Sequence, residues 1–219
     1  MTMGAHFIDE LETRQRIADA GAAAVGLGST GKPERQVAYE EWLFPHPDDD
    51  RFQAAMADAM YSCGLNARSC LRAAGIDAPE LSAPYSRSVG SILTWLETVA
   101  RRMSSFVDLR KKSAVDVAPA LDFGDVLVVD GPTHVIVLTE KIDATTFITS
   151  EGGTPEVGTS KTGVPGEKGM CIKSRTMRIR RTPDGRLQTG TVGKDGGVIW
   201  GRIAIWAINA RWLQTGDGA

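Results

Sequence analysis

The chain has 219 residues, of which 42% are hydrophobic and 24% are charged. This composition is ordinary for a single globular domain and argues against extensive disorder. The net charge of −2 excludes a globally basic surface for nucleic acid or for an anionic membrane. Local basic clusters, RKK at 110–112 and RIRR at 178–181, are interspersed with acids and indicate a solvated surface.

The N-terminal sequence MTMGAHFIDELETRQ has no basic region followed by an apolar stretch. We therefore expect no secretory signal and synthesis in the cytoplasm. No window approaches the roughly eighteen apolar residues that a membrane-spanning helix needs, so none is expected.

The first half of the chain carries helical patterns. A helix is expected over residues 8–25, ending at the glycine-rich GLGSTGKP. The next segment, VAYEEWLFPHPDDD at 37–50, contains too many prolines for a regular element. A second helix is expected to begin in DDDRFQAAMADAM, where apolar residues recur at helical spacing, and to stop at Gly75. A third is expected over residues 89–106.

After residue 120 the pattern changes to β-strands. GDVLVVDGPTHVIVLTEKIDATTFITSEGG alternates β-branched runs with turn signals and predicts three strands. A polar loop at 154–169 and a hairpin with PDG at its turn follow, and GRIAIWAINARWL predicts one or two closing strands. The fold class is therefore α+β in one domain, 1–219, with a helical part at about 1–115 and an antiparallel sheet at about 120–219.

Two kinds of site are disfavoured by spacing. Gly26–Lys32 fits a phosphate-binding G-x-x-x-x-G-K pattern, but Pro33 stands where a hydroxyl should hold magnesium, and the loop follows a helix rather than a strand. A zinc site would draw on three cysteines and three histidines, but no C-x-x-C or H-x-x-x-H spacing occurs. We expect no metal and no cofactor.

Two of the three cysteines, Cys63 and Cys70, lie seven residues apart in one predicted helix. A helix rises about 1.5 Å per residue, so the two thiols are too far apart for a disulfide. Either is compatible with ordinary core packing. Cys63 is favoured as a nucleophile because Ser62 and Gly64 leave room for a substrate carbonyl, whereas Cys70 lies on the core stripe.

A candidate base and a candidate orienting acid lie downstream. His134 opens the apolar strand HVIVL, and Glu151 ends the next strand, TFITSE. If the two strands pair antiparallel about the KIDA turn, the start of one lies beside the end of the other, so His134 and Glu151 become neighbours. Each could also be an ordinary surface residue.

Residues 60–153 resemble the CHAP and NlpC-type papain-like cysteine amidases and endopeptidases, which cut cell-wall peptides. The resemblance is carried by SCGLNARSCLRAAGI, by FGDVLVVDGPTHVIVLTE with Gly124-Asp125 about ten residues before His134, and by TFITSEGG. It implies a papain-like fold and a Cys63–His134–Glu151 triad that hydrolyses amide bonds of peptidoglycan stem peptides by acyl transfer.

The same resemblance implies a biological setting. A wall hydrolase without a signal peptide would reach the wall as a phage-type lysin or as an antibacterial effector delivered by type VI secretion into the periplasm of a target cell. An effector would be accompanied by an immunity protein. The alternatives are an inactive papain-like module that binds a peptide or partner, and a cytosolic cysteine protease or deamidase. The sequence leaves open whether the helix breaks at Ser62 and exposes Cys63 at its N-terminus.

Overall fold

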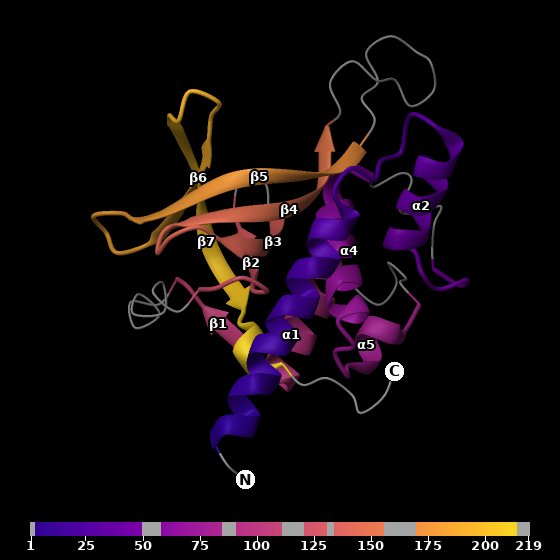
Figure 1. The fold of residues 1–219 in the computed structure, drawn as a ribbon, viewed down its shortest axis with the longest axis horizontal. Coiled ribbons are helices and arrows are strands. Elements are labelled where there is room, and N and C mark those ends of the chain that lie inside the picture. The colour runs from indigo at the N-terminus through magenta and orange to yellow at the C-terminus, as the bar shows by residue number, and fades with distance from the viewer. Residues whose placement is uncertain are drawn as a thin grey trace.

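The computed structural model describes residues 3–49, 58–84, 91–110, 121–130, 134–155 and 170–213. Helices occupy the N-terminal half and strands the C-terminal half (Figure 1). The helices are α1 (Met3–Ala24), α2 (Pro33–Leu43), α4 (Asp58–Ala73), α5 (Pro79–Ser82), α6 (Ile92–Arg102) and the short 3-10 helix η3 (Ala210–Trp212). The strands are β1 (Phe106–Asp108), β2 (Val126–Val129), β3 (His134–Lys141), β4 (Thr146–Pro155), β5 (Met170–Arg181), β6 (Leu187–Val192) and β7 (Val198–Ile208).

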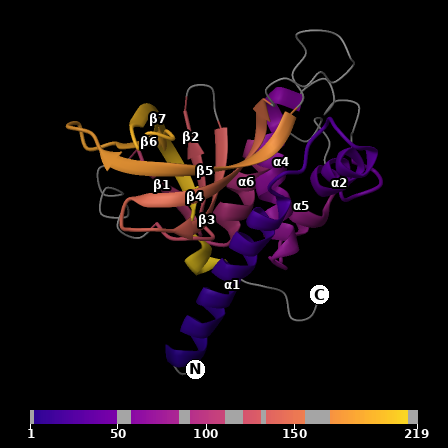
Figure 2. The ribbon, with the colours of Figure 1, turned by 45° about the horizontal axis from the view of Figure 1, so that its top comes forward.

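The strands form a closed antiparallel barrel. Their order is β1-β7-β2-β3-β4-β5-β6, and β6 also pairs with β7. Strands β2 to β7 therefore form a closed barrel, and the short strand β1 pairs with the end of β7. The α+β class is therefore confirmed, but the predicted sheet is a barrel. The helices lie along one side of it, with α1 crossing in front of α4 in Figure 1, and Figure 2 shows the same helical layer beside the strands.

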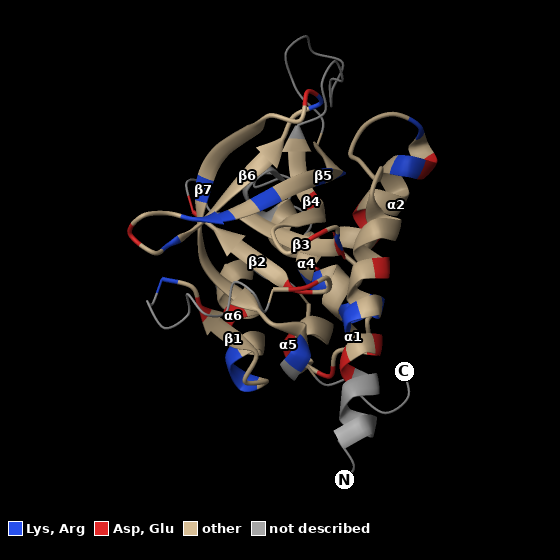
Figure 3. Ribbon diagram, turned by 60° about the vertical axis from the view of Figure 1, so that its left-hand side comes forward, with Lys and Arg blue, Asp and Glu red and all other residues tan. Residues whose placement is uncertain are grey.

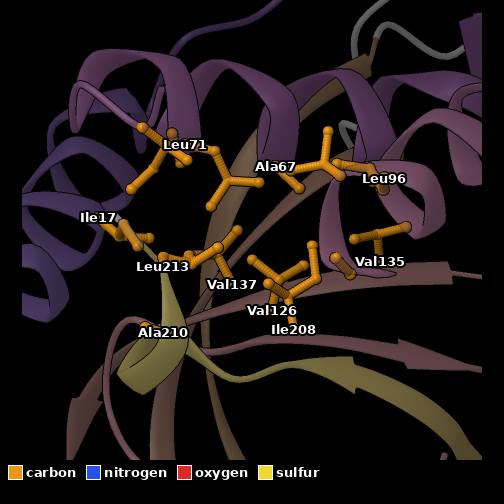
Figure 4. Packing of buried hydrophobic residues seen from close by; sticks show 14 of the residues in the cluster. Ile17, Ala67, Leu71, Leu96, Val126, Val135, Val137, Ile208, Ala210 and Leu213 are labelled. Atoms are coloured by element: carbon orange, nitrogen blue, oxygen red, sulfur yellow. The ribbon is translucent and has the colours of Figure 1, made fainter. Parts of the chain in front are cut away.

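Strand alternation divides the apolar residues of β2, β3 and β7 between two of the three apolar clusters found among the described residues. One lies between the helices and the outer face of β2, β3 and β7, and Figure 4 shows Leu71 and Leu96 of the helices on one side of it and Val126 and Val137 of the strands on the other. The other fills the barrel and includes Leu127 and Phe147. Because successive side chains on a strand point to opposite faces, the continuous apolar runs of β2 and β3 serve both cores.

The structure corrects the prediction of no regular element at residues 37–50. Helix α2 extends to Leu43, since the prolines of that segment lie at 45 and 47, beyond its end. Pro33 occupies the first turn of α2, where its missing N–H costs nothing. Its C-cap residue is Phe44, which precedes a proline and takes a non-helical conformation.

The helix predicted over 89–106 is shorter than expected. Helix α6 covers Ile92–Arg102, with Ser91 as its N-cap, and the chain then enters strand β1 at Phe106. Ser104, at φ 56°, separates the two elements.

The short helix α5 and strand β1 carry no pattern that sequence analysis could separate from their neighbours, because each spans at most four residues. The helix expected to start in DDDRFQAAMADAM is seen from Asp58 onward as α4, since residues 50–57 lie outside the described ones.

The C-terminal half follows its predicted order. The first predicted three-strand region forms β2, β3 and β4, the PDG hairpin forms β5 and β6, and the closing segment forms the single strand β7. Most of the loop predicted at 154–169 lies outside the described residues. Arginines of RIRR are exposed along β5, as expected for a solvated surface, and appear as a blue stretch in Figure 3. Arg110 is exposed too, while the rest of RKK is outside the described residues.

A buried polar cluster joins the two ends of the chain to the barrel. Arg14 of α1 donates to Asp125 Oδ1 at 2.7 Å and to Asn209 Oδ1 at 2.9 Å. The backbone N–H of Ala210 also donates to Asp125 Oδ1, at 2.8 Å. Gly124, at φ 83°, lets the backbone pass so close to Arg14 that a Cβ there would lie 2.7 Å from its Cα. The Gly-Asp pair ahead of β2 thus anchors helix α1 and the C-terminal segment.

Candidate active site

The β3–β4 hairpin brings His134 and Glu151 together. His134 is the first residue of β3, and β4 pairs antiparallel with β3 through Val137 and Ser150. That register places the start of one strand beside the far part of the other. His134 Nε2 lies 3.0 Å from Glu151 Oε2, within hydrogen-bond distance. Both side chains are largely buried, with exposed fractions of 16% for His134 and 8% for Glu151.

Two further residues hold the Glu151 carboxylate. Thr149 Oγ1 donates to Glu151 Oε1 at 2.9 Å, and Arg175 Nε of β5 lies 3.9 Å from Oε2. Burial opposes the ionisation of Glu151, but the hydrogen bond and charge of His134, followed by Arg175 and Thr149, outweigh it, and the pKa of the carboxyl is lowered. Glu151 therefore faces His134 as a carboxylate.

Cys63 reaches the same place from helix α4. Its thiol forms a hydrogen bond with the His134 side chain. Because Nε2 of His134 is held by Glu151, Nδ1 is the ring nitrogen left for the sulfur. Helix α4 runs from Asp58 to Ala73 without a break at Ser62, which answers the question that the sequence left open. Cys63 therefore does not lie in the first turn of α4, and the helix dipole contributes little to its activation.

The Cys63 thiol and the His134 imidazole shift each other's pKa. Burial is the largest influence on the Cys63 thiol and disfavours the thiolate, but the hydrogen bond and charge of His134 and the N–H groups of Val135 and Gly64 outweigh it, so the pKa of Cys63 is lowered. Burial likewise disfavours the imidazolium, yet hydrogen bonds and charges of Cys63 and Glu151 raise the pKa of His134 to about 9. These shifts favour a thiolate beside an imidazolium, which is the reactive form of a nucleophilic cysteine.

A second layer of polar residues locks α4 onto β4. Asn66, one turn after Cys63, donates to Ser150 Oγ at 3.3 Å and accepts from Trp42 Nε1 of α2 at 2.8 Å. Gly152 lies so close to α4 that a Cβ there would be 2.4 Å from the carbonyl oxygen of Ser62. Sequence reasoning missed these residues, and their only signal was the Gly-Gly pair after Glu151.

The other cysteines lie in different surroundings. Cys70 is fully buried in the core between the helices and the barrel, and burial raises the pKa of its thiol. Cys171 of β5 donates to the carbonyl of Thr154 at 3.4 Å. All three cysteines are free thiols. Among the side chains that the structure describes, no three of the His, Cys, Asp and Glu groups gather into a metal-binding cluster.

The glycine-rich loop at 26–32 is tied into the fold by its own backbone. The N–H groups of Gly26 and Ser29 donate to carbonyls of β5, at 2.9 and 2.8 Å, and the loop carbonyls of Gly26 and Thr30 accept from Arg35. These groups are therefore occupied by the protein. The loop packs against β5 through its backbone, which is a structural role.

Comparison with protein-family models, with curated proteins and with solved structures gives no match to this chain. No helix within the described residues is long and apolar enough to cross a membrane.

Proposed function

We propose that the protein is a cysteine-dependent amide hydrolase with Cys63 as nucleophile, His134 as general base and acid, and Glu151 as the residue that orients the imidazole. The observation that carries the proposal is the continuous hydrogen-bonded chain from the buried thiol through the imidazole to the carboxylate. A structural cysteine in a core has its thiol pKa raised by burial, as Cys70 has. Cys63 differs from it in the direction of the shift.

The reaction follows from this arrangement. The Cys63 thiolate attacks the amide carbonyl carbon, and His134, protonated at the outset, gives its proton to the leaving amine as the C–N bond breaks. A water molecule, deprotonated by His134, then hydrolyses the thioester and releases the Cys63 thiolate beside the reprotonated imidazole. Glu151 keeps the imidazole in place and stabilises its positive charge throughout.

The N–H group of Val135, at the start of β3, is the donor we assign to the oxyanion. It lowers the pKa of the Cys63 thiol in the resting site, so it lies beside the sulfur. An oxyanion formed by attack of that sulfur develops within about 3 Å of it, where this donor can stabilise the new negative charge.

The substrate class rests on the resemblance to the CHAP and NlpC-type enzymes. We propose that the fold is papain-like and that the substrate is the peptide part of peptidoglycan, cut at an amide bond. The order of the site residues along the chain, a helical cysteine followed by a histidine and an acid on adjoining strands, supports this. Delivery to the wall as a lysin, or to a target periplasm as a type VI effector with an immunity protein, belongs to the same proposal.

Purified peptidoglycan tests the proposed reaction directly. The wild-type protein should release soluble muropeptide fragments, and Cys63→Ala should release none, because no other described thiol contacts His134. Cys70→Ala is the matched control: it removes a thiol from the same helix and should keep the activity. The absence of fragments from walls of every chemotype, with the wild-type protein folded, would refute the peptidoglycan assignment.

A thiol-directed probe separates the alternatives. A protein protease or deamidase should be labelled at Cys63 near neutral pH while leaving walls intact. An inactive binding module should show no preferential labelling of Cys63 over Cys70 and Cys171.

A further inference from the structure

Arg202 of β7 points toward the inside of the barrel. It pairs with Thr189 of β6, which is 5% exposed, and Ala204, two residues further along β7, belongs to the core inside the barrel. Side chains two residues apart on a regular strand share a face. The Arg202 side chain therefore starts from the inner face of the barrel, which it shares with the apolar core and with Thr189.

One nitrogen of the partly buried Arg202 guanidinium lacks a hydrogen-bond partner within the described residues. Its Nη1 atom is buried and finds no hydrogen-bond acceptor within the part of the chain that the structure describes. Burying a charged group without a partner is unfavourable, and buried polar groups in folded proteins are almost always paired. An acceptor from outside the chain would satisfy it, and the planar fork of arginine matches a carboxylate.

Arg202 lies at the end of the barrel that holds the candidate site. Val129 of β2 pairs with His134 on one side and with Ala204 on the other. Arg202 is two residues beyond Ala204, toward the end at which β3 begins. Arg175, which approaches Glu151, lies on β5, so the two arginines stand on the two neighbours of β6.

We propose that Arg202 and Arg175 bind a free carboxylate of the substrate at this end of the barrel. Arg202 supplies its unpaired Nη1 atom, and Arg175, whose side chain is 38% exposed, supplies a second cation next to the imidazole–carboxylate pair. The substrate class is then an amide flanked by a free carboxylate, rather than any amide that reaches Cys63. This inference rests on the proposed hydrolase function and adds its substrate preference.

Synthetic wall stem peptides test the preference. Each peptide is compared with its analogue in which the free carboxylates are converted to carboxamides. The wild-type protein should cleave the carboxylate form with kcat/KM roughly tenfold or more above the carboxamide form, the range expected for a charge-assisted contact. Arg202→Met should bring the ratio close to one and keep the carboxamide rate.

Arg178→Gln is the matched control. Arg178 is an exposed cation on β5 that pairs with Gly190 of β6, and its loss should leave the ratio unchanged. Equal cleavage of both peptides by the wild-type protein would overturn the inference while leaving the hydrolase proposal intact. A loss of both rates in Arg202→Met by the same factor would overturn it too.

Binding separates failure of the subsite from failure of the reaction. Calorimetric titration of Cys63→Ala protein should show tighter binding of the carboxylate peptide, and the added Arg202→Met change should remove the difference. This holds even if no peptide is cleaved. Equal affinities of the Cys63→Ala protein for both peptides would refute the subsite.

Thermal unfolding of Arg202→Met supplies the structural check. Because the buried Nη1 has no partner to lose, its replacement by an apolar side chain should leave the Tm unchanged or raise it. A marked fall in Tm would show that Arg202 supports the fold and would overturn its assignment to a ligand.

Discussion

Cys63 and His134 each change the ionisation of the other, and Glu151 adds to the effect on the imidazole. The thiolate is stabilised because a cation stands beside it, and the imidazolium because two anions do. Both groups are buried, which by itself would favour their neutral forms. The reactive state of the site is therefore a property of the hydrogen-bonded group and not of Cys63 alone.

This coupling predicts a falling limb in the pH dependence. His134 holds its proton below a pKa of about 9, so kcat/KM for the peptidoglycan substrate should decline as the pH rises through about 9. Glu151→Gln removes one of the two anions that raise this pKa, so its falling limb should lie at lower pH. Initial rates between pH 5 and 10.5 would locate the falling limb of the wild-type protein and that of Glu151→Gln.

Glu140→Gln is the control for the pH measurement. It removes a carboxylate from the same strand as His134, but Glu140 is exposed and does not influence the imidazole. Its falling limb should coincide with that of the wild-type protein. A Glu151→Gln limb that does not move would contradict the assignment of Glu151 to the imidazole.

The sequence could indicate His134 and Glu151 because both lie on one hairpin, where pairing follows from two strands and a turn. It could also favour Cys63 over Cys70 from the size of the neighbouring residues. It could not indicate Arg175 or Asn66. Arg175 approaches Glu151 only through the register of a strand that follows a long loop, and Asn66 bonds to Ser150 only after a helix docks on the barrel.

At the scale of elements, the contact between α4 and β4 decides whether the site forms. The two approach so closely at Gly152 that only a residue without Cβ fits against the backbone of Ser62. Cys63 is the next residue along the helix. A displacement of α4 from β4 would therefore separate the thiol from the imidazole before it affected the His134–Glu151 pair.

Gly152→Ala should show this sensitivity. A Cβ at this position would also lie 3.0 Å from Asn66 Cβ, so the helix or the strand must shift, at a cost of about 1–3 kcal/mol in the free energy of unfolding. Labelling of Cys63 by a thiol reagent near neutral pH should slow as the helix shifts. Urea unfolding and labelling rates would measure the two effects.

The matched control for this substitution is Gly201→Ala. Gly201 lies on β7, and a Cβ there would meet nothing within 4 Å. Its stability and its labelling rate should remain near those of the wild-type protein. If Gly152→Ala behaved like Gly201→Ala, the close approach of α4 to β4 would be wrong.

For the whole molecule, the Arg14–Asp125 cluster connects helix α1, the barrel and the C-terminal segment. Asp125 is fully buried and accepts from the backbone of Asp122 and Ala210 as well as from Arg14. A buried charge that loses its partner is strongly destabilising. This cluster is a buried polar link between helix α1 and the C-terminal segment.

Asp125→Ala should therefore lower the free energy of unfolding by about 3–5 kcal/mol, because it leaves the Arg14 guanidinium buried beside an apolar side chain. Guanidinium chloride unfolding would measure this change. Glu12→Ala, which breaks an exposed pair with Arg16 on the same helix, should change the midpoint little. Similar midpoints for the two variants would contradict the anchoring role of Asp125.

The closure of the barrel lay beyond sequence analysis. Alternation predicted the strands, and turn residues predicted the β3–β4 and β5–β6 hairpins. The pairing of β7 with β2 joins residues about eighty positions apart and includes a bulge between Val128 and Val129. Neither the partner nor the bulge has a local signal, so the sequence supports a sheet and leaves its closure open.

The positions of the three site residues along the chain determine at which stage of folding Cys63 becomes reactive. His134 and Glu151 are 17 residues apart on one hairpin, whereas Cys63 precedes His134 by 71 residues on a helix that must dock from outside the barrel. Contacts between distant segments form late in folding because closing long loops is costly. Before docking, Cys63 is an ordinary thiol that is mostly protonated at neutral pH. In a nascent or partly unfolded chain, Cys63 therefore has the low reactivity of an ordinary thiol. It becomes a strong nucleophile only when the fold is complete.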